Sequence, residues 1–252
     1  MEPDDESYEM VAPDGRTHES PRHGFQGDRG PMPARPNVPA SLTIAMSREA
    51  GSRGSTIARR AGRKLGWQVY TQELLEYIAQ EGAFRQTVAD NLPGDASAWI
   101  EQRLETLHRE QHLSENPSIN ELARIVLALG AQGEVIVIGR GAGCILPRES
   151  TLNVRIIAPI DERIAYMSQW LRLTVHEAAE QVEMRDRRRA DFITTHFQRQ
   201  PNDPYQYDLL LNSSLLGEDL CAELIAQAAR AKLEANLESF RPSPSWVPES
   251  VD

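Results

Sequence analysis

The sequence predicts an α/β fold in which helices cover both faces of a parallel sheet. Short apolar runs alternate along the chain with longer stretches whose apolar residues recur at helical spacing. The run from Val135 to Ile138 contains only valine and isoleucine, which is typical of a strand buried on both faces of a parallel sheet. The chain has 252 residues, 40% of them apolar, and so can bury one sizeable core. We therefore expect one open, three-layer domain whose ligands bind beyond the carboxyl ends of its strands.

The composition divides the chain into a domain and two tails. Residues 1–40 are rich in proline, glycine and charged residues, and their apolar residues are too scattered to define a face. Residues 241–252 contain three prolines. We expect both segments to be disordered tails and residues 41–240 to form the domain.

The domain opens with a strand, a turn of small residues and an amphipathic helix. The strand begins near Ser41, and the helix carries apolar residues at helical spacing up to Gly66. Further strands are expected at 67–70, 135–138, 152–157 and 207–211, and further helices at 73–80, 161–171, 174–189 and 218–238. The stretch from Ala83 to Gln132 is expected to be wholly helical. Its stripe of apolar residues from Leu122 to Leu129 is either core or a dimer contact.

The first turn has the character of a phosphate-binding loop. Small residues let backbone N–H groups face an anion, and the helix that follows adds its N-terminal dipole. In the pattern GxxxxGK[ST], the lysine position is occupied here by Gly54 and the preceding glycine position by Arg53. The hydroxyl that would meet Mg²⁺ belongs to Ser55 or Thr56. The residues expected to bind the phosphates are Gly51, Ser52, Arg53, Gly54, Ser55 and Thr56, with Ser55 and Thr56 also expected at the metal.

Five segments together resemble the cytidylate kinase-like family, which belongs to the nucleoside monophosphate kinases of the P-loop fold. They are TIAMSREAGSRGSTIARRAGRKLGWQVY, VIVIGRGAGCIL, NVRIIAPIDERI, DRRRADF and YDLLLNSS, in the family's order and spacing. The resemblance covers roughly residues 41–230. It implies a three-layer P-loop kinase fold with a five-stranded parallel sheet, a helical insertion that shapes the acceptor site and an arginine-rich lid. It also implies that the chain uses ATP and Mg²⁺.

The resemblance assigns roles to individual residues on the acceptor side. Arg140 matches the arginine with which cytidylate kinases hold the monophosphate, whereas Gly141 replaces the family's aspartate. Thr71 also stands where the family usually has an aspartate. Arg155 brings a positive charge toward the edge of the sheet. We therefore expect Arg140, Gly141 and Arg155 to contact the acceptor.

The charge of the missing lysine must come from arginine or from Mg²⁺. Glycine at position 54 is typical of this branch of the family. Lys64 lies about 12 Å along the helix from Thr56, at ~1.5 Å per residue, which is too far for its charge to replace that of the missing lysine. The run Arg185 to Arg189 resembles the lid, whose arginines spread the charge of a loose transition state. The catalytic candidates are Arg48, Arg53, Arg185, Asp186 and Arg189, with Asp186 expected to orient arginines rather than act as a base.

Two function classes follow from these observations. The first is a kinase that transfers the γ-phosphoryl group of ATP to a nucleoside monophosphate, CMP or dCMP in type, or to a related small acceptor. The second is a catalytically weak nucleotide-binding relative that acts as a sensor or scaffold. A net charge of −10 argues against nucleic acid as a partner. No apolar run approaches the ~20 residues of a membrane span, so we expect a cytoplasmic protein whose partners are small nucleotides.

Overall fold

The computed structural model describes residues 38–39, 41–81, 92 and 95–239. The two tails expected to be disordered, and the residues 83–91 and 93–94 of the expected helical stretch, lie outside the described residues, apart from Val38 and Pro39.

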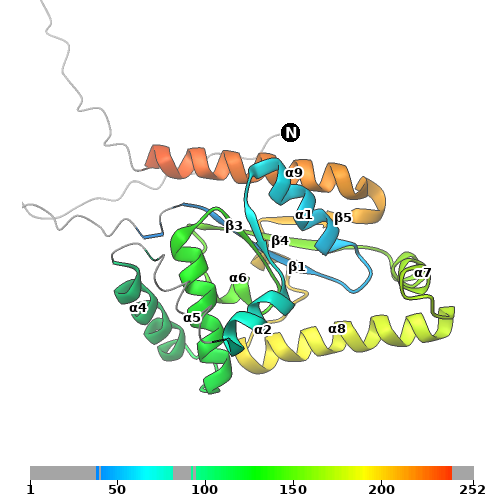
Figure 1. Ribbon diagram of the computed structural model, residues 1–252, viewed down its shortest axis with the longest axis horizontal. Coiled ribbons are helices and arrows are strands. Elements are labelled where there is room, and N and C mark those ends of the chain that lie inside the picture. Colours follow the sequence, from blue (N-terminus) through cyan, green and yellow to red (C-terminus); the bar gives the residue numbers. More distant parts are fainter. Residues whose placement is uncertain (1–37, 40, 82–91, 93–94, 240–252) are drawn as a thin grey trace, which may run out of the picture. The chain divides into compact units, whose positions relative to one another are not determined.

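The described chain forms a five-stranded, all-parallel sheet with the strand order β2-β3-β1-β4-β5 (Figure 1), which confirms the predicted fold class. The strands are β1 (Thr43–Arg48), β2 (Gln68–Tyr70), β3 (Val135–Ile138), β4 (Thr151–Ile157) and β5 (Leu209–Asn212). The central strand β1 pairs with β3 through Ile44 and Ile136 and with β4 through Ile44 and Leu152. The carboxyl ends of these three strands therefore meet at one edge of the sheet.

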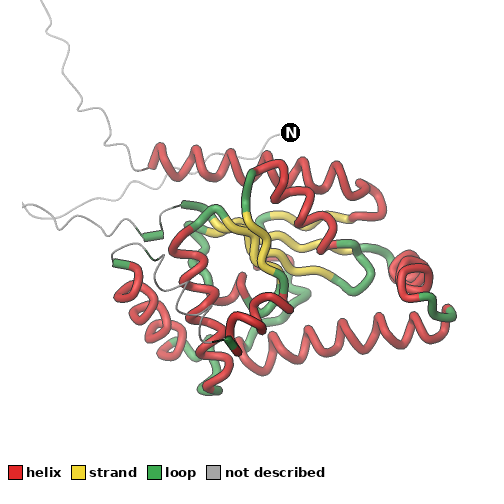
Figure 2. The backbone as a smooth tube through the Cα atoms, in the orientation of Figure 1, coloured by secondary structure: helices red, strands yellow, loops and turns green. Residues whose placement is uncertain are grey.

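Helices cover both faces of the sheet, as Figures 1 and 2 show. On one face, α1 (Gly54–Leu65) and α9 (Ser213–Ser239) pack on Ile44, Met46 and Ile138. On the other face, α2 (Gln72–Gln80), α5 (Pro117–Gln132) and α6 (Ala142–Ile145) pack on Ala45 and Val137. Neighbouring residues of each strand point to opposite layers because side chains alternate along a strand.

The described part of the central stretch is helical, as expected, except for a short segment between two helices, so it is not wholly helical. Helix α4 (Ala96–Arg109) ends before Gln111, whose φ of 57° leaves the helical region. Helix α5 begins again after Asn116, whose side chain caps it, with Pro117 in the first turn. The stripe from Leu122 to Leu129 lies in the hydrophobic core, which decides for the core alternative.

A helical hairpin, α7 (Ile160–Leu171) and α8 (Val175–Phe197), follows β4. Thr174 and Glu177 form a capping box that starts α8. We expected this helix to end near residue 189, but it continues for two more turns because Phe197 is fully buried in the core and fixes the end of the helix there. The arginine run therefore lies in the middle of a helix.

The last elements start at positions shifted from those expected. Strand β5 begins two residues late, because residues Pro204–Gln206 form a 3₁₀ turn that Asp203 caps. Helix α9 is two helices joined across a kink at Gly217, so the predicted start at Glu218 matches the second of them. None of the described helices is both long and apolar enough to cross a membrane.

Candidate functional site

Two cavities lie side by side at the carboxyl ends of the strands. The larger, of about 520 Å³, is lined by the end of β1, by Asn153 and Arg155 within β4, by the start of α2, by residues 139–144, by α8, and by residues 201, 206 and 207. The smaller, of about 350 Å³, is lined by residues 48–51 and 53–56, by Thr71 and Glu73 at the start of α2, by α7 and by α8. Four residues line both cavities, and we call them the shared wall: Arg48, Glu73, Arg185 and Arg189.

The loop of the smaller cavity has the conformation of an anion cradle. Gly51 and Arg53 have φ values of 81° and 60°, and Arg53 precedes the first turn of α1. Within the part of the chain that the structure describes, the N–H groups of Gly51, Arg53, Gly54 and Ser55 meet no acceptor. Free amides at a helix N-terminus form an anion site. The predicted phosphate-binding residues thus line one cavity, except for Ser52, which is buried behind it and donates its hydroxyl to the Glu49 carbonyl oxygen.

The side chain of Arg48 fills the space that a lysine at position 54 would need. A Cβ atom at Gly54 would lie 2.7 Å from the Arg48 Cβ and 3.0 Å from its Cγ. A Cβ atom at Gly139 would collide with the Arg48 guanidinium. The two glycines therefore leave room for the side chain of Arg48, which lines both cavities.

The surroundings of Arg48 are rich in positive charge. Burial, and then the neighbouring Arg189 and Arg140, lower the pKa of Arg48 to about 10, while Glu73 opposes this shift. Three buried donors on the lining of the larger cavity have no partner within the described residues: the Ser47 hydroxyl, Arg48 Nε and Arg140 Nε. Unsatisfied donors are costly in an empty site, so this arrangement favours an anionic ligand.

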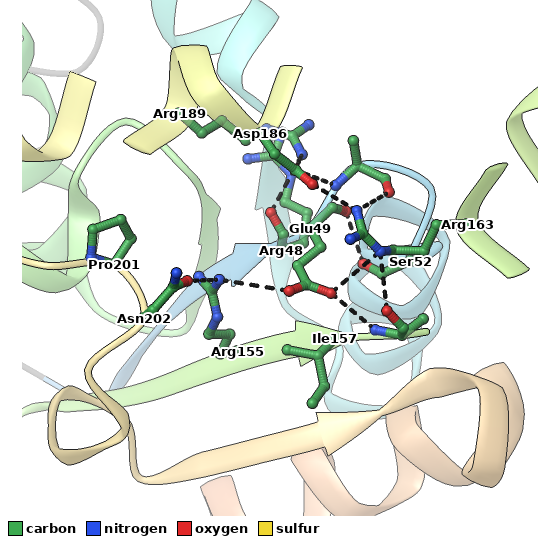
Figure 3. Close-up of polar contacts among 12 residues, drawn as sticks. Arg48, Glu49, Ser52, Arg155, Ile157, Arg163, Asp186, Arg189, Pro201 and Asn202 are labelled. Atoms are coloured by element: carbon green, nitrogen blue, oxygen red, sulfur yellow. Dashed lines mark hydrogen bonds and ion pairs between the residues drawn. The ribbon is translucent and has the colours of Figure 1, made fainter. Parts of the chain in front are cut away.

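Asp186 connects α8 to the phosphate-binding loop (Figure 3). Its Oδ1 accepts the Ala50 N–H at 2.7 Å, and its Oδ2 accepts Arg163 Nη1 at 2.6 Å. Arg189 Nη1 lies 3.6 Å from the same carboxylate and donates to the carbonyl oxygen of Arg48 at 3.3 Å. Asp186 lines neither cavity. Asp186 therefore contacts two arginines and the loop backbone, and its role in orienting arginines stays a prediction.

Arg163 and Glu49 also join the loop to the start of α7. The Arg163 guanidinium also donates to the carbonyl oxygens of Ala50 and Ala158, at 3.1 and 3.0 Å. Glu49 accepts the Ala158 N–H at 3.1 Å (Figure 3). A Cβ atom at Gly51 would lie 2.6 Å from the carbonyl oxygen of Arg163. The loop and α7 are therefore packed backbone against backbone, and Gly51 serves this packing as well as the cradle.

Among the catalytic candidates, Arg53 lies apart from the others. Its guanidinium stands over the Tyr166 ring at 5.0 Å, and its Nε lies 3.9 Å from Glu218 Oε1. Of the two cavities, Arg53 lines only the smaller one. By contrast, Arg48, Arg185 and Arg189 all belong to the shared wall.

The acceptor candidates line the larger cavity. Arg140 forms an ion pair with Glu76. Arg155 is buried, and its Nη2 donates to Asn202 Oδ1 at 2.9 Å. Gly141 has a φ of 72° and lies tight against the ring of Phe197, which leaves no room for a side chain such as aspartate.

Sequence reasoning named Arg188 only as part of the run that resembles the lid and did not single out Glu73, although both line the larger cavity. That the stretch 83–132 shapes the acceptor site stays a prediction. None of the described residues of α4 and α5 lines the larger cavity. Glu73 lies in the first turn of α2, where an acidic residue is common for helix stability, so nothing in the sequence distinguished it. Hydrogen bonds from its own amide and the Thr71 hydroxyl, together with Arg48 and Arg140, lower the pKa of Glu73 in spite of partial burial.

Comparisons with known proteins identify the chain's relatives. Residues 43–215 match the model of the cytidylate kinase-like family. Among solved structures, an uncharacterized protein from Eubacterium ventriosum is 15% identical with a TM-score of 0.61, covering 76% of this chain and 99% of that one. A shikimate kinase from Bacteroides thetaiotaomicron is 16% identical with a TM-score of 0.40, covering 77% and 98%.

A uronate isomerase from Corynebacterium glutamicum is 26% identical over 98 residues. That match spans 38% of this chain and 19% of the isomerase. At 15% identity, the likeness to the Eubacterium ventriosum protein shows a shared fold.

Proposed function

The chain belongs to the cytidylate kinase-like family, and from that premise we propose that it is a nucleotide-binding kinase. It transfers the γ-phosphoryl group of ATP to a nucleoside monophosphate of the CMP or dCMP type, or to a related small acceptor. The smaller cavity is the donor site and the larger cavity is the acceptor site.

The shared wall is the observation that carries this proposal. A transferring phosphoryl group must contact donor and acceptor at once, and it spreads negative charge over its oxygens in a loose transition state. Three arginines, Arg48, Arg185 and Arg189, lie where the two cavities meet. Positive charge fixed at this place stabilises the transition state more than either bound ligand, which is the condition for faster transfer.

The remaining residues divide between the two sites. The free amides of the phosphate-binding loop would hold the donor phosphates. Mg²⁺ bound with ATP would neutralise charge on those phosphates, and the hydroxyls of Ser55 and Thr56 are the groups on this loop suited to it. Arg140 and Arg155 would hold the anionic part of the acceptor through charge-assisted hydrogen bonds.

A nucleotide sensor is the second candidate, and one observation favours it. The Asp186 carboxylate accepts the Ala50 N–H, so a negative group of the protein already forms a hydrogen bond with one backbone amide beside the loop. In a sensor, nucleotide binding would compete with this contact and change the position of α8 without phosphoryl transfer.

ADP release separates the two candidates. The purified protein is given ATP and Mg²⁺ with a panel of nucleoside monophosphates, and ADP and thermal shift are followed together. A kinase releases ADP in an acceptor-dependent way, and Arg189→Ala lowers kcat by about 10³ or more, the value of a comparable arginine in other phosphoryl-transfer sites, while ATP still binds.

Arg187→Ala is the matched control on the same helix. Its side chain is 68% exposed, pairs with Glu183 and lines neither cavity, so its kcat should equal that of the parent. A thermal shift with ATP and no ADP release with any acceptor would exclude the kinase and leave the sensor.

A further inference from the structure

One carboxylate stands on the shared wall among the arginines. Glu73 lines both cavities, and no other described residue lining the larger cavity is acidic. It projects from the first turn of α2, while Arg48 comes from β1, Arg140 from the turn after β3 and Arg189 from α8. All three arginines interact electrostatically with Glu73. The carboxylate therefore stands at the point where donor and acceptor meet.

The sign of this charge matters for the nucleophile. A phosphate monoester that attacks the γ-phosphoryl group is already largely ionised at neutral pH, because its second pKa is about 6, and it therefore needs no base. A hydroxyl group is neutral and must lose its proton during transfer. For a hydroxyl the same carboxylate is favourable, because it accepts that proton.

We propose that Glu73 is the general base of the reaction and that the acceptor is a small anionic compound whose attacking group is a hydroxyl. This inference rests on the proposed kinase function and deepens it. The hydroxyl oxygen forms a bond to the γ-phosphorus as the bond from that phosphorus to the β–γ bridging oxygen breaks. The hydroxyl proton passes to a carboxylate oxygen of Glu73, and ADP and a phosphate monoester are the products. The proton then leaves Glu73 for solvent.

The anionic part of the acceptor follows from the rest of the larger cavity. Six arginines line it: Arg48, Arg140, Arg155, Arg185, Arg188 and Arg189. Three of them, with Glu73, belong to the shared wall and face the transferring group. Arg140, Arg155 and Arg188 lie outside the shared wall. Arg140 pairs with Glu76 and Arg155 donates to Asn202, but Arg140 Nε is buried without a partner among the described residues and can donate to a carboxylate or a phosphate of the acceptor.

Single-turnover ADP release with Glu73→Gln tests the proposal. Parent and variant full chains are mixed with ATP and Mg²⁺ and with one of four probes: water alone, CMP, the hydroxy acid glycerate, or glycerol phosphate. Products are identified by ³¹P NMR, which distinguishes a phosphate ester from a phosphoanhydride. Glu81→Gln is the matched control, because Glu81 is an exposed residue at the end of the same helix and lines neither cavity.

We expect a phosphate ester as the product with glycerate or glycerol phosphate, and whichever is faster identifies the anionic group as carboxylate or phosphate. Glu73→Gln should lower the rate by about 10²–10⁴, the range for a lost general base, also with water, at nearly unchanged ATP affinity. Glu81→Gln should match the parent. A phosphoanhydride formed from CMP, a parental rate in Glu73→Gln, or a loss restored by raising Mg²⁺ would each overturn the proposal and leave the kinase function standing. No ADP release with any probe would instead reject the kinase function, and this inference with it.

Discussion

The clearest test of the site's construction is a methyl group added at Gly54. The new Cβ would lie 2.7 Å from the Arg48 Cβ, an atom next to the backbone of the central strand that cannot rotate away. Overpacking of this kind costs about 1–3 kcal/mol, while alanine in place of glycine returns at most ~1 kcal/mol in a helix. Gly54→Ala should therefore destabilise the protein, although the same change stabilises most helices.

Repeating Gly54→Ala in two Arg48 variants tests whether the contact with the Arg48 Cβ atom causes the destabilisation. Arg48→Ala keeps the Cβ atom, so Gly54→Ala should remain destabilising in it. Arg48→Gly removes the Cβ atom, so Gly54→Ala should become neutral or stabilising. The free energy of unfolding is measured by urea denaturation, and Tm should follow at about 2–4 °C per kcal/mol for a domain of this size.

The two backgrounds must give different effects of Gly54→Ala. Distant sites add within ~0.3–0.5 kcal/mol. If the effect of Gly54→Ala is the same within that scatter after Arg48→Gly and after Arg48→Ala, Arg48 does not occupy the lysine space, and the account of the missing lysine is refuted.

Three further predictions concern charge at the site. Arg48→Met should raise Tm at neutral pH and abolish ADP release, because the parent buries a guanidinium whose folded-state pKa is lowered from its ordinary value to about 10, chiefly by burial. As the pH rises past about 10, the unfolded chain holds more protons than the folded chain, so parental stability should rise there and the advantage of the variant should shrink. Arg140→Ala should raise the acceptor KM and leave the Kd for ATP near the parental value in a calorimetric titration; a selective loss of ATP binding would place Arg140 on the donor side. Asp186→Asn should lower the free energy of unfolding by about 1.5–3 kcal/mol through the weakened contacts with Ala50 and Arg163, and an unchanged urea midpoint would show that the connection is not stabilising.

The fold could be predicted because its signals are local. Val135 to Ile138 and the glycine-bounded first helix carry their periodicity in a few neighbouring residues, and the sheet and its flanking helices follow. The end of α8 could not be predicted in this way, since it depends on Phe197, whose burial requires contacts with distant helices. The end of α4 depends on backbone geometry at Gln111, where no glycine or proline marks it, whereas Asn116 and Pro117 do mark the start of α5.

In the candidate site, too, features that depend on neighbouring residues could be predicted and those that depend on distant contacts could not. The loop from Gly51 to Thr56 is contiguous in sequence, so the sequence alone was enough to predict an anion site there. The role of Glu73 depends on two cavities meeting beside it, which no single-sequence pattern records. Likewise, the sequence shows only that Gly54 replaces a lysine, whereas the structure shows that the Arg48 side chain occupies the space that this lysine would need.

Helix α8 places Arg185 and Arg189 on one continuous rod that borders both cavities. Two ligands that share contacts with one rigid element are thermodynamically linked, and the linkage is reciprocal. If an occupied donor cavity tightens acceptor binding by some factor, an occupied acceptor cavity must tighten donor binding by the same factor, commonly about 5–150-fold. A kinase built in this way would therefore discriminate against half-filled states, and it would hold ATP most firmly only when a molecule able to receive its phosphoryl group is already present.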